Sequence, residues 1–184
     1  IIKIKTSGDI YKNSRLSELG GKGLFSKEID GALLEGSIDI AVHSVKDLET
    51  RLCEGISIVS VLKREDVRDV MLSQKVNFLS ELPSGSVIGT SSLRRQAQIL
   101  RKFPRLKCVL FRGNIQARIT KLKNNDVDAI LLAMAGLNRL GLADLATEVF
   151  EPEFMLPAVG QGAIGVTCRE NDKGAEAVAS LIND

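Results

Sequence analysis

The chain has 184 residues, of which 44% are hydrophobic and 26% are charged, and its formal net charge is +2. This composition is typical of a globular protein and excludes a disordered or fibrous one, and the length allows one ordinary domain or two small ones. The sequence holds no apolar run near the roughly 18–20 residues that cross a bilayer, so we expect no membrane partner.

Apolar runs of strand length alternate along the chain with amphipathic runs that fit helices. Strands are expected over Ile1–Thr6, Ile38–His43, Ser57–Leu62, Val70–Ser73, Ser86–Thr90, Cys108–Arg112, Ala129–Ala133 and Ala163–Thr167. Helices are expected over Ser26–Glu35, Ser92–Lys102 and Ile115–Asn124. This alternation predicts an α/β fold, in which helices connect the strands of a sheet. Ligands of such open sheets bind at the carboxyl ends of the strands, where helices begin.

The charges are unevenly spread along the chain. Between Ser84 and Asn125 there is no Asp or Glu, while ten residues are Arg or Lys. Such an unbalanced stretch predicts an anionic ligand. Nucleic acid is the weakest choice of anion, because its binding sites interleave aromatic and basic residues, whereas this chain has one Tyr and no Trp.

Residues 86–95 read as a strand, a hydroxyl-rich turn and the start of a helix, with Ser91 or Ser92 as the N-cap. The first helical turn usually carries Asp or Glu, because the helix dipole is positive there. This helix opens instead with Arg94 and Arg95. Backbone N–H groups, hydroxyls and two guanidinium groups in one place suit a carboxylate or phosphate. The alternative is a solvated basic helix face.

The next predicted strand repeats this arrangement. Arg112 stands at its carboxyl end, and Arg118 lies about one turn into the helix that follows. A weaker third copy places Arg139 near a short helix, where an ordinary surface charge is the alternative. Arginines at successive strand ends indicate a ligand with several negative charges.

A second candidate site follows the strand over residues 38–43, where the chain reads Ser44-Val45-Lys46-Asp47. A carboxylate beside a cation stays ionised and can stabilise a developing positive charge, or exchange a proton with an amine leaving group. The alternative is an ordinary loop salt bridge between Lys46 and Asp47. His43 is the single histidine, and as a strand residue we interpret it as structural.

The three cysteines, Cys53, Cys108 and Cys168, are widely spaced and form no Cys-x-x-Cys motif. This pattern argues against a disulfide framework and against a zinc site, so we expect no metal. A reducing cytoplasm is the simplest location for such a chain.

Two glycine-rich segments are less specific. Residues 20–25 resemble a phosphate-binding loop in composition but lack its spacing, so a flexible entry to a helix is the alternative. Residues 159–163 form a glycine-bracketed turn that permits a close backbone approach or a tight crossing.

Six segments together resemble the porphobilinogen deaminases (hydroxymethylbilane synthases), in the order in which that family carries them. They are Gly20–Phe25, Ala41–Asp47, Gly89–Gln96, Arg112–Asn114, Gly136–Gly141 and Leu156–Ala163, and they are distributed along nearly the whole chain. The resemblance implies a transferase of tetrapyrrole (haem) biosynthesis. Such an enzyme deaminates four porphobilinogen molecules and polymerises them on a dipyrromethane cofactor to give hydroxymethylbilane.

The resemblance also implies an architecture. We expect two α/β lobes similar to type II periplasmic binding proteins, with the active-site cleft between them. Domain 1 would comprise residues 1–62 and 163–184, and domain 2 would comprise residues 63–162. The family's opening strand and its third domain, which attaches the cofactor through a cysteine, have no counterpart in this sequence, so we expect this chain alone to be inactive. We expect a monomer.

The family's site residues can be carried over one by one. Asp47 matches the catalytic aspartate, which binds pyrrole N–H groups and supports positive charge as the amine leaves. The carboxylate-binding arginines match Arg94, Arg95, Arg112, Arg118 and Arg139. Positions near the cofactor's side chains match Ser44, Lys46, Thr90, Ser91 and Ser92. A mobile loop matches Lys22 and Phe25, and Asp9 matches a family turn in which helix capping is an equal alternative.

A non-catalytic module is the main alternative to an enzyme. Two α/β lobes lined with arginine would also suit a protein that binds a carboxylate or a phosphate without changing it. The Lys46–Asp47 pair argues against a secreted receptor of this kind.

Overall fold

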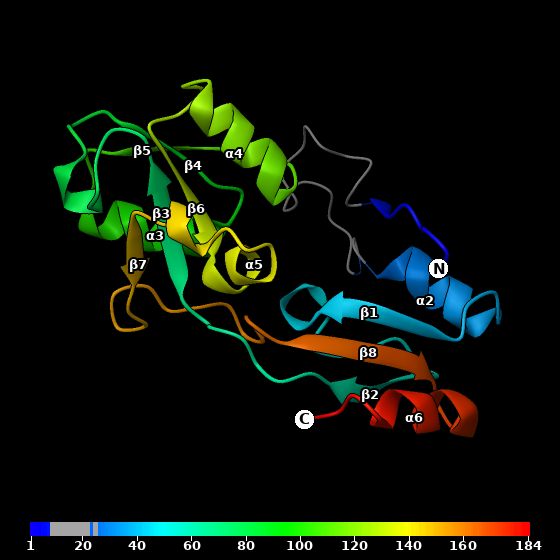
Figure 1. Cartoon of the computed structure of the whole chain (residues 1–184). Coiled ribbons are helices and arrows are strands. Elements are labelled where there is room, and N and C mark those ends of the chain that lie inside the picture. Colours follow the sequence, from blue (N-terminus) through cyan, green and yellow to red (C-terminus); the bar gives the residue numbers. More distant parts are fainter. Residues whose placement is uncertain (8–22, 24–25) are drawn as a thin grey trace. The chain divides into compact units, whose positions relative to one another are not determined.

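The computed structural model describes residues 1–7, 23 and 26–184, and the chain divides into two compact units (Figure 1). Unit 1 comprises residues 1–65 and 159–184, and unit 2 comprises residues 66–158. The sequence predicts these crossings a few residues away, after residues 62 and 162. Unit 2 is therefore an insertion in unit 1.

Within the described residues, unit 1 is built on a three-stranded antiparallel sheet in the order β1-β8-β2. The strands are β1 (Ile40–Ser44), β2 (Ile56–Val61) and β8 (Ile164–Arg169). The α-helices in the described part of this unit are α2 (Lys27–Leu34) and α6 (Lys173–Ser180). The buried side chains of Leu33, Ala41 and Ile56 join α2 to β1 and β2 in one apolar cluster.

The turn at residues 159–163 packs against the end of β1. The backbone N–H of Val45 donates to the carbonyl of Ala163 at 3.1 Å, which continues the β1–β8 pairing by one residue. Gly160 has a φ of +70°, and a Cβ there would lie 2.8 Å from Val45 Cγ1. Only glycine suits both the backbone angle and the close approach. This contact helps to position the short 3₁₀ helix η1 (Val45–Asp47), which carries Lys46 and Asp47.

Unit 2 contains a five-stranded sheet among the residues that the structure describes, in the order β5-β4-β6-β3-β7. The strands are β3 (Asp69–Ser73), β4 (Val87–Gly89), β5 (Lys107–Val109), β6 (Ala129–Ala133) and β7 (Glu148–Phe150). Strands β5, β4 and β6 are parallel, whereas β3 runs antiparallel to both β6 and β7. The first residue of β3 therefore lies at the edge of the sheet where the parallel strands end.

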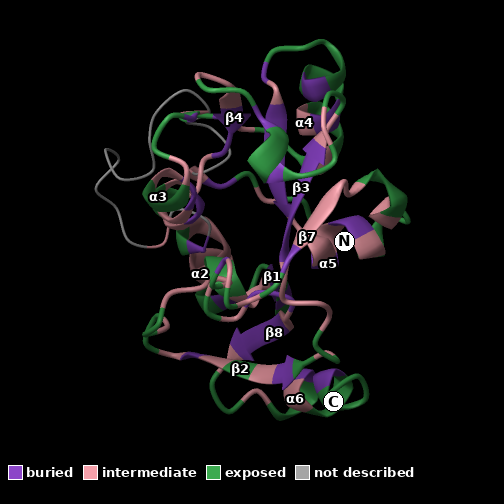
Figure 2. Ribbon diagram, turned by 90° about the vertical axis from the view of Figure 1, so that its left-hand side faces the viewer, coloured by how far each residue is buried: buried purple, intermediate pink, exposed green. Residues whose placement is uncertain are grey.

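Helices α3 (Leu93–Lys102), α4 (Ile115–Lys123) and α5 (Met134–Arg139) complete unit 2, with the 3₁₀ helices η2 (Leu79–Glu81) and η3 (Ala143–Leu145). The sheet has an apolar cluster on each face. Met71 and Leu131 belong to one cluster, and Val70 and Leu132 belong to the other. Successive strand residues point to opposite faces, so a strand covered on both sides is apolar throughout. Strand β3 accordingly has the colour of buried residues in Figure 2.

The predicted α/β class is confirmed, and the differences are local. The strand expected over Ile1–Thr6 is absent: the first six residues have no regular structure, and Ile1 and Ile2 are exposed. An isolated segment cannot form the hydrogen-bond ladder that defines a strand. Helix α6 and strand β7 are not predicted, because α6 buries only alanines and β7 has three residues. No helix in the described ranges has the length and hydropathy to cross a membrane.

Substituting Gly89 by alanine should destabilise unit 2. A Cβ at this position would lie 2.6 Å from Cγ of Phe111, a buried core ring, and overpacking of this kind costs about 1–3 kcal/mol. Chemical denaturation should show the loss. The matched control is Gly31→Ala in α2, where the added Cβ meets no atom within 4 Å. That change should stabilise the protein by up to about 1 kcal/mol through helix propensity. A Gly89→Ala variant as stable as the parent protein would contradict the packing.

Candidate functional site

Two helices of unit 2 begin beside the ends of neighbouring parallel strands. The side chain of Ser92 caps α3 by accepting the N–H of Arg95 at 3.4 Å, and Thr90 Oγ1 accepts the N–H of Ser92 at 3.2 Å. Asn114 caps α4 by accepting the N–H of Ala117 at 2.8 Å. The structure thus brings the N-terminal ends of α3 and α4, with their positive dipole ends, to the edge of the sheet predicted to bind ligand.

A hydroxyl group links these two strand ends. Ser91 Oγ donates to the carbonyl of Phe111 at 2.8 Å, and the backbone N–H of Thr90 donates to the carbonyl of Val109 at 3.0 Å. Thr90 itself is buried. Of the predicted hydroxyl residues in unit 2, Ser91 and Thr90 therefore have defined structural partners, and Ser92 serves as the helix cap.

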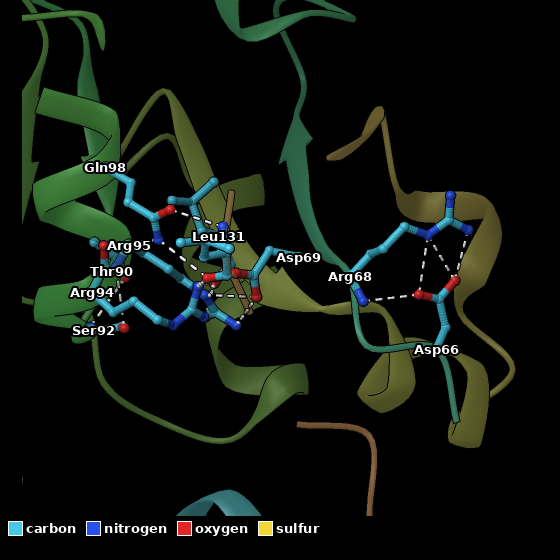
Figure 3. A network of polar contacts seen from close by, with 10 residues as sticks. Asp66, Arg68, Asp69, Thr90, Ser92, Arg94, Arg95, Gln98 and Leu131 are labelled. Carbon is cyan, nitrogen blue, oxygen red and sulfur yellow. Dashed lines mark hydrogen bonds and ion pairs between the residues drawn. The ribbon is translucent and has the colours of Figure 1, made fainter. Parts of the chain in front are cut away.

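Asp69 is the carboxylate around which this edge is organised (Figure 3). It is the first residue of β3, pairs with Ala133 at the end of β6, and is fully buried. Its Oδ1 accepts Nε and Nη2 of Arg95 at 3.1 and 2.7 Å, and its Oδ2 accepts Nη1 of Arg94 at 2.6 Å. One buried carboxylate therefore binds two arginines that are adjacent in the sequence.

Arg94 and Arg95 differ in how many of their guanidinium nitrogens already have a hydrogen-bond acceptor. Arg95 is 6% exposed, and its third nitrogen, Nη1, donates to the carbonyl of Leu131 at 2.9 Å, so each of its guanidinium nitrogens has a partner. The side chain of Arg94 is 25% exposed. Its Nη1 contacts both Asp69 and the carbonyl of Leu156, while its Nε and Nη2 donate to no described residue.

Charge keeps this cluster ionised. Burial alone would raise the pKa of Asp69, but the charge of Arg95 and the hydrogen bonds from both arginines hold that pKa below its ordinary value. Burial lowers the pKa of Arg95, and the charge of Asp69 opposes this shift. Asp69 is therefore an ionised carboxylate at neutral pH, paired with the guanidinium group of Arg95.

Arg112 and Arg118 add positive charge near this cluster. Arg112 is half-buried and lies three residues beyond the end of β5, and Nε of Arg118 donates to the carbonyl of Gly113 at 2.8 Å. Burial lowers the pKa of Arg118, and the positive charges of Arg95 and Arg112 lower it further. The positive charges of Arg95, Arg112 and Arg118 therefore repel one another. A bound anion would relieve this repulsion.

Arg139 lies at the carboxyl end of α5 and is exposed. Helix α5 packs closely on the start of α4, since a Cβ on Gly136 would lie 2.7 Å from Ile115 Cδ1. The position of Arg139 on α5 does not test its predicted role in binding carboxylates, which stays a prediction.

The predicted catalytic segment belongs to unit 1. Ser44 ends β1, and Lys46 and Asp47 lie in η1 with exposed side chains. Although the side chain of Asp47 is exposed, neighbouring protein atoms displace part of its hydration and raise the pKa of Asp47, while the charges of Lys46 and His43 act to lower that pKa. His43 is buried, with Nε2 3.0 Å from Thr167 Oγ1, so it belongs to the packing between β1 and β8.

Three predicted residues, Asp9, Lys22 and Phe25, lie outside the described residues. Sequence reasoning missed Asp69, although a signal was present: an acid opens an otherwise apolar strand, a position that should be expensive to bury without a counter-charge. Within the described ranges, no group of three or more His, Cys, Asp or Glu residues could hold a metal ion. All three cysteines are free thiols.

The fold resembles that of type II periplasmic binding proteins. A periplasmic substrate-binding protein of an ABC transporter from Coxiella burnetii superposes with a TM-score of 0.56 at 20% identity, covering 86% of this chain and 76% of its own. The methionine-binding protein MetQ superposes with a TM-score of 0.55 at 19% identity, covering 83% of this chain and 71% of its own. These likenesses establish the architecture alone.

Sequence comparison identifies the family. Residues 1–177 match the family described as porphobilinogen deaminase, dipyromethane cofactor binding domain. The chloroplastic porphobilinogen deaminase of Oryza sativa subsp. japonica is 58% identical over 94% of this chain and 48% of its own length. That of Trichlorobacter lovleyi is 53% identical over 98% of this chain and 58% of its own length. The chain belongs to the porphobilinogen deaminase family and spans about half the length of these curated relatives.

Replacing Asp69 by asparagine should lower the free energy of unfolding by about 3–5 kcal/mol at neutral pH, because it leaves the buried guanidinium of Arg95 without its counter-charge. The folded-state pKa of Asp69 is lowered. Its stabilisation is therefore complete above the unfolded-state pKa of about 3.9 and is lost as pH falls through the lower folded-state value.

Urea denaturation at several pH values checks this. The difference in stability between parent and variant should be constant from pH 7 to about pH 5 and should shrink in more acidic solution. A difference that grows as the pH falls would contradict the ionised pair.

Proposed function

We propose that this chain is the cofactor- and substrate-binding part of a hydroxymethylbilane synthase, a transferase that deaminates porphobilinogen and links four units on a dipyrromethane primer. The observation that carries the proposal is the arginine cluster where α3 and α4 begin, in a chain that belongs to the porphobilinogen deaminase family. The family's described domain binds the dipyrromethane cofactor, which supports the choice of ligand.

The donors present suit such a cofactor. Each pyrrole of the family's substrate carries an acetate and a propionate, so a dipyrrole presents several carboxylates. Arginine binds carboxylates through paired N–H groups, and helix N-termini add backbone donors. Arg94 and the capped start of α3 supply donors of this kind. Arg112, Arg118 and the capped start of α4 supply them after the neighbouring parallel strand. When bound, a dipyrromethane would supply the pyrrole carbon to which the first substrate unit is joined.

Asp47 would act where the amine leaves. A carboxylate there can accept hydrogen bonds from pyrrole N–H groups and stabilise positive charge that develops on the ring as the C–N bond breaks. Lys46 lies beside it on η1, and its charge favours the ionised form of Asp47. Ser44 ends the strand that leads into this segment and would contact the cofactor's side chains.

The cofactor would be attached by a cysteine outside residues 1–184. Cys108 and Cys168 have pKa values raised by burial, which makes their thiols less nucleophilic. Cys53 is exposed, but it lies in none of the six segments that resemble the family. We therefore expect no turnover from this chain by itself. We also propose a monomer in a reducing compartment: the cytoplasm, or the chloroplast if the name of the rice relative applies.

A non-catalytic anion-binding module is the second candidate. Two solved structures that share this fold are named as a periplasmic substrate-binding protein of an ABC transporter and as a methionine-binding protein. The two candidates differ in chemistry, since a binding module would take up a carboxylate or phosphate and release it unchanged. Covalent pyrrole on the protein is thus the discriminating property.

The first test is an intact mass of the natural full-length protein, followed by Ehrlich's aldehyde reagent. We expect a mass excess equal to two linked pyrroles and the colour of a dipyrrole, because the arginine cluster and the family both indicate a bound dipyrromethane. No excess and no colour, even after porphobilinogen is supplied, would overturn the enzyme and favour the binding module.

The second test replaces Asp47 by asparagine in the full-length protein. The change removes the charge but keeps the shape, so consumption of porphobilinogen should fall at least about 100-fold, as for other groups that stabilise transition-state charge. Asp39→Asn is the matched control, since Asp39 is an exposed acid of the same unit. Turnover close to that of the parent protein would rule out the catalytic role of Asp47.

The pH profile adds a second readout for Asp47. The raised pKa means that its carboxylate is lost at a higher pH than an ordinary aspartate. Activity of the full-length protein should therefore fall as the pH drops through that raised value, and the remaining activity of Asp47→Asn should lack this acid limb.

A further inference from the structure

Asp69 determines how the two arginines at the start of α3 are oriented. Consecutive helical residues point about 100° apart, so Arg94 and Arg95 would ordinarily project in different directions. A free arginine side chain also has many rotamers, and a ligand that binds it has to remove this conformational freedom. The two oxygens of Asp69 instead hold both guanidinium groups against a single buried point.

Arg94 is fixed from a second side as well. Gln98, one turn further along α3, accepts the N–H of Leu156 at 2.8 Å and donates to its carbonyl at 3.2 Å. The same carbonyl accepts Nη1 of Arg94. Since Asp69 and Leu156 both bind Nη1, the guanidinium is oriented through one nitrogen, and the N–H groups on Nε and Nη2 face no acceptor among the described residues.

We propose that Asp69 is a positioning residue for the carboxylate site: it holds Arg94 with its remaining N–H groups available to the ligand, and Arg95 supplies the charge that allows Asp69 to be buried. The inference rests on the proposed function of the arginine cluster and deepens it by giving the two adjacent arginines different tasks. Arg94 meets the carboxylates of the pyrrole chain, and Arg95 acts through Asp69.

Charge balance supports this division. Asp69 and Arg95 form a neutral pair that is almost completely buried, with side chains 0% and 8% exposed. The contact of Arg94 with the same carboxylate leaves the trio with one net positive charge, carried on the more exposed side chain. A neutral buried pair beside a partly exposed cation is the arrangement expected when one arginine must stay solvated enough to exchange water for a ligand.

The test is a double-mutant cycle in the full-length protein, with Asp69→Asn, Arg94→Gln and the two combined. Three quantities are measured: dipyrromethane content by intact mass, KM and kcat for porphobilinogen, and stability. Asp128→Asn is the matched control. Its carboxylate also lies in unit 2, where it pairs with Lys75 at 2.5 Å and accepts the N–H of Val87 at 2.7 Å, but it has no contact with the arginines in the described residues.

We expect Asp69→Asn and Arg94→Gln each to raise KM about tenfold. A tenfold change corresponds to about 1.4 kcal/mol, the contribution of one charge-assisted hydrogen bond. Both variants should also contain less dipyrromethane than the parent protein. The double variant should be no worse than Arg94→Gln alone, because Asp69 acts through that residue. Asp128→Asn should lower stability and leave loading and KM unchanged. A purely structural role for Asp69 would lower stability in the same way without moving KM.

A second variant tests the inference if Asp69→Asn does not fold. The combination Asp69→Asn with Arg95→Met removes both buried charges, which proteins tolerate better than the loss of one partner. If this variant folds and has the KM and loading of the parent protein, the inference is overturned. The inference would also be overturned if the fold-change in KM of the double variant equalled the product of the fold-changes of Asp69→Asn and Arg94→Gln.

The parent protein separates this inference from the proposed function. A full-length parent without dipyrromethane and without porphobilinogen consumption would overturn both. A loaded and active parent whose Asp69→Asn variant keeps normal KM and loading would overturn the positioning role alone.

Discussion

The ion pairs of the buried Asp69 carboxylate with Arg94 and Arg95 organise the edge of unit 2 at which α3 begins. Burying a charge is unfavourable unless it is paired and hydrogen-bonded, and here three hydrogen bonds from two guanidinium groups satisfy both of its oxygens. The topology makes this meeting possible. Because β3 runs antiparallel to β6, its first residue reaches the edge where the parallel strands end and where α3 begins.

The turn between β4 and α3 places the first turn of α3 within reach of Asp69. Helix α3 must begin close to the end of β4 if its first turn is to reach Asp69, and the Thr90–Ser92 contact makes the short turn between them. Gly89, directly before that turn, leaves space for the ring of Phe111. The carbonyl of Phe111 then accepts Ser91 Oγ, so backbone space, packing and hydrogen bonding all fix the same few residues.

Much of this could be predicted from the sequence, for identifiable reasons. The interior residues of β3 and all of β6 are apolar. The caps Ser92 and Asn114 precede amphipathic runs, and both accept the expected backbone N–H groups. Prediction failed where the signal depends on distant partners. A strand over residues 1–6 needs a neighbour, and the role of Asp69 needs arginines 25 and 26 positions away. The different environments of Arg94 and Arg95 also follow from tertiary contacts, since the two residues are identical in type and adjacent.

The insertion of unit 2 into unit 1 has a consequence for how the protein is made. Strand β8 lies in the middle of the unit 1 sheet, and β1 and β2 each pair with it and not with each other. Its residues follow the whole of unit 2 in the chain, so a ribosome releases them after unit 2 is complete. Contacts so distant in sequence slow folding. We therefore infer that unit 2, which is one continuous stretch of the chain, folds first. The sheet of unit 1 then forms when its central strand, β8, has been synthesised.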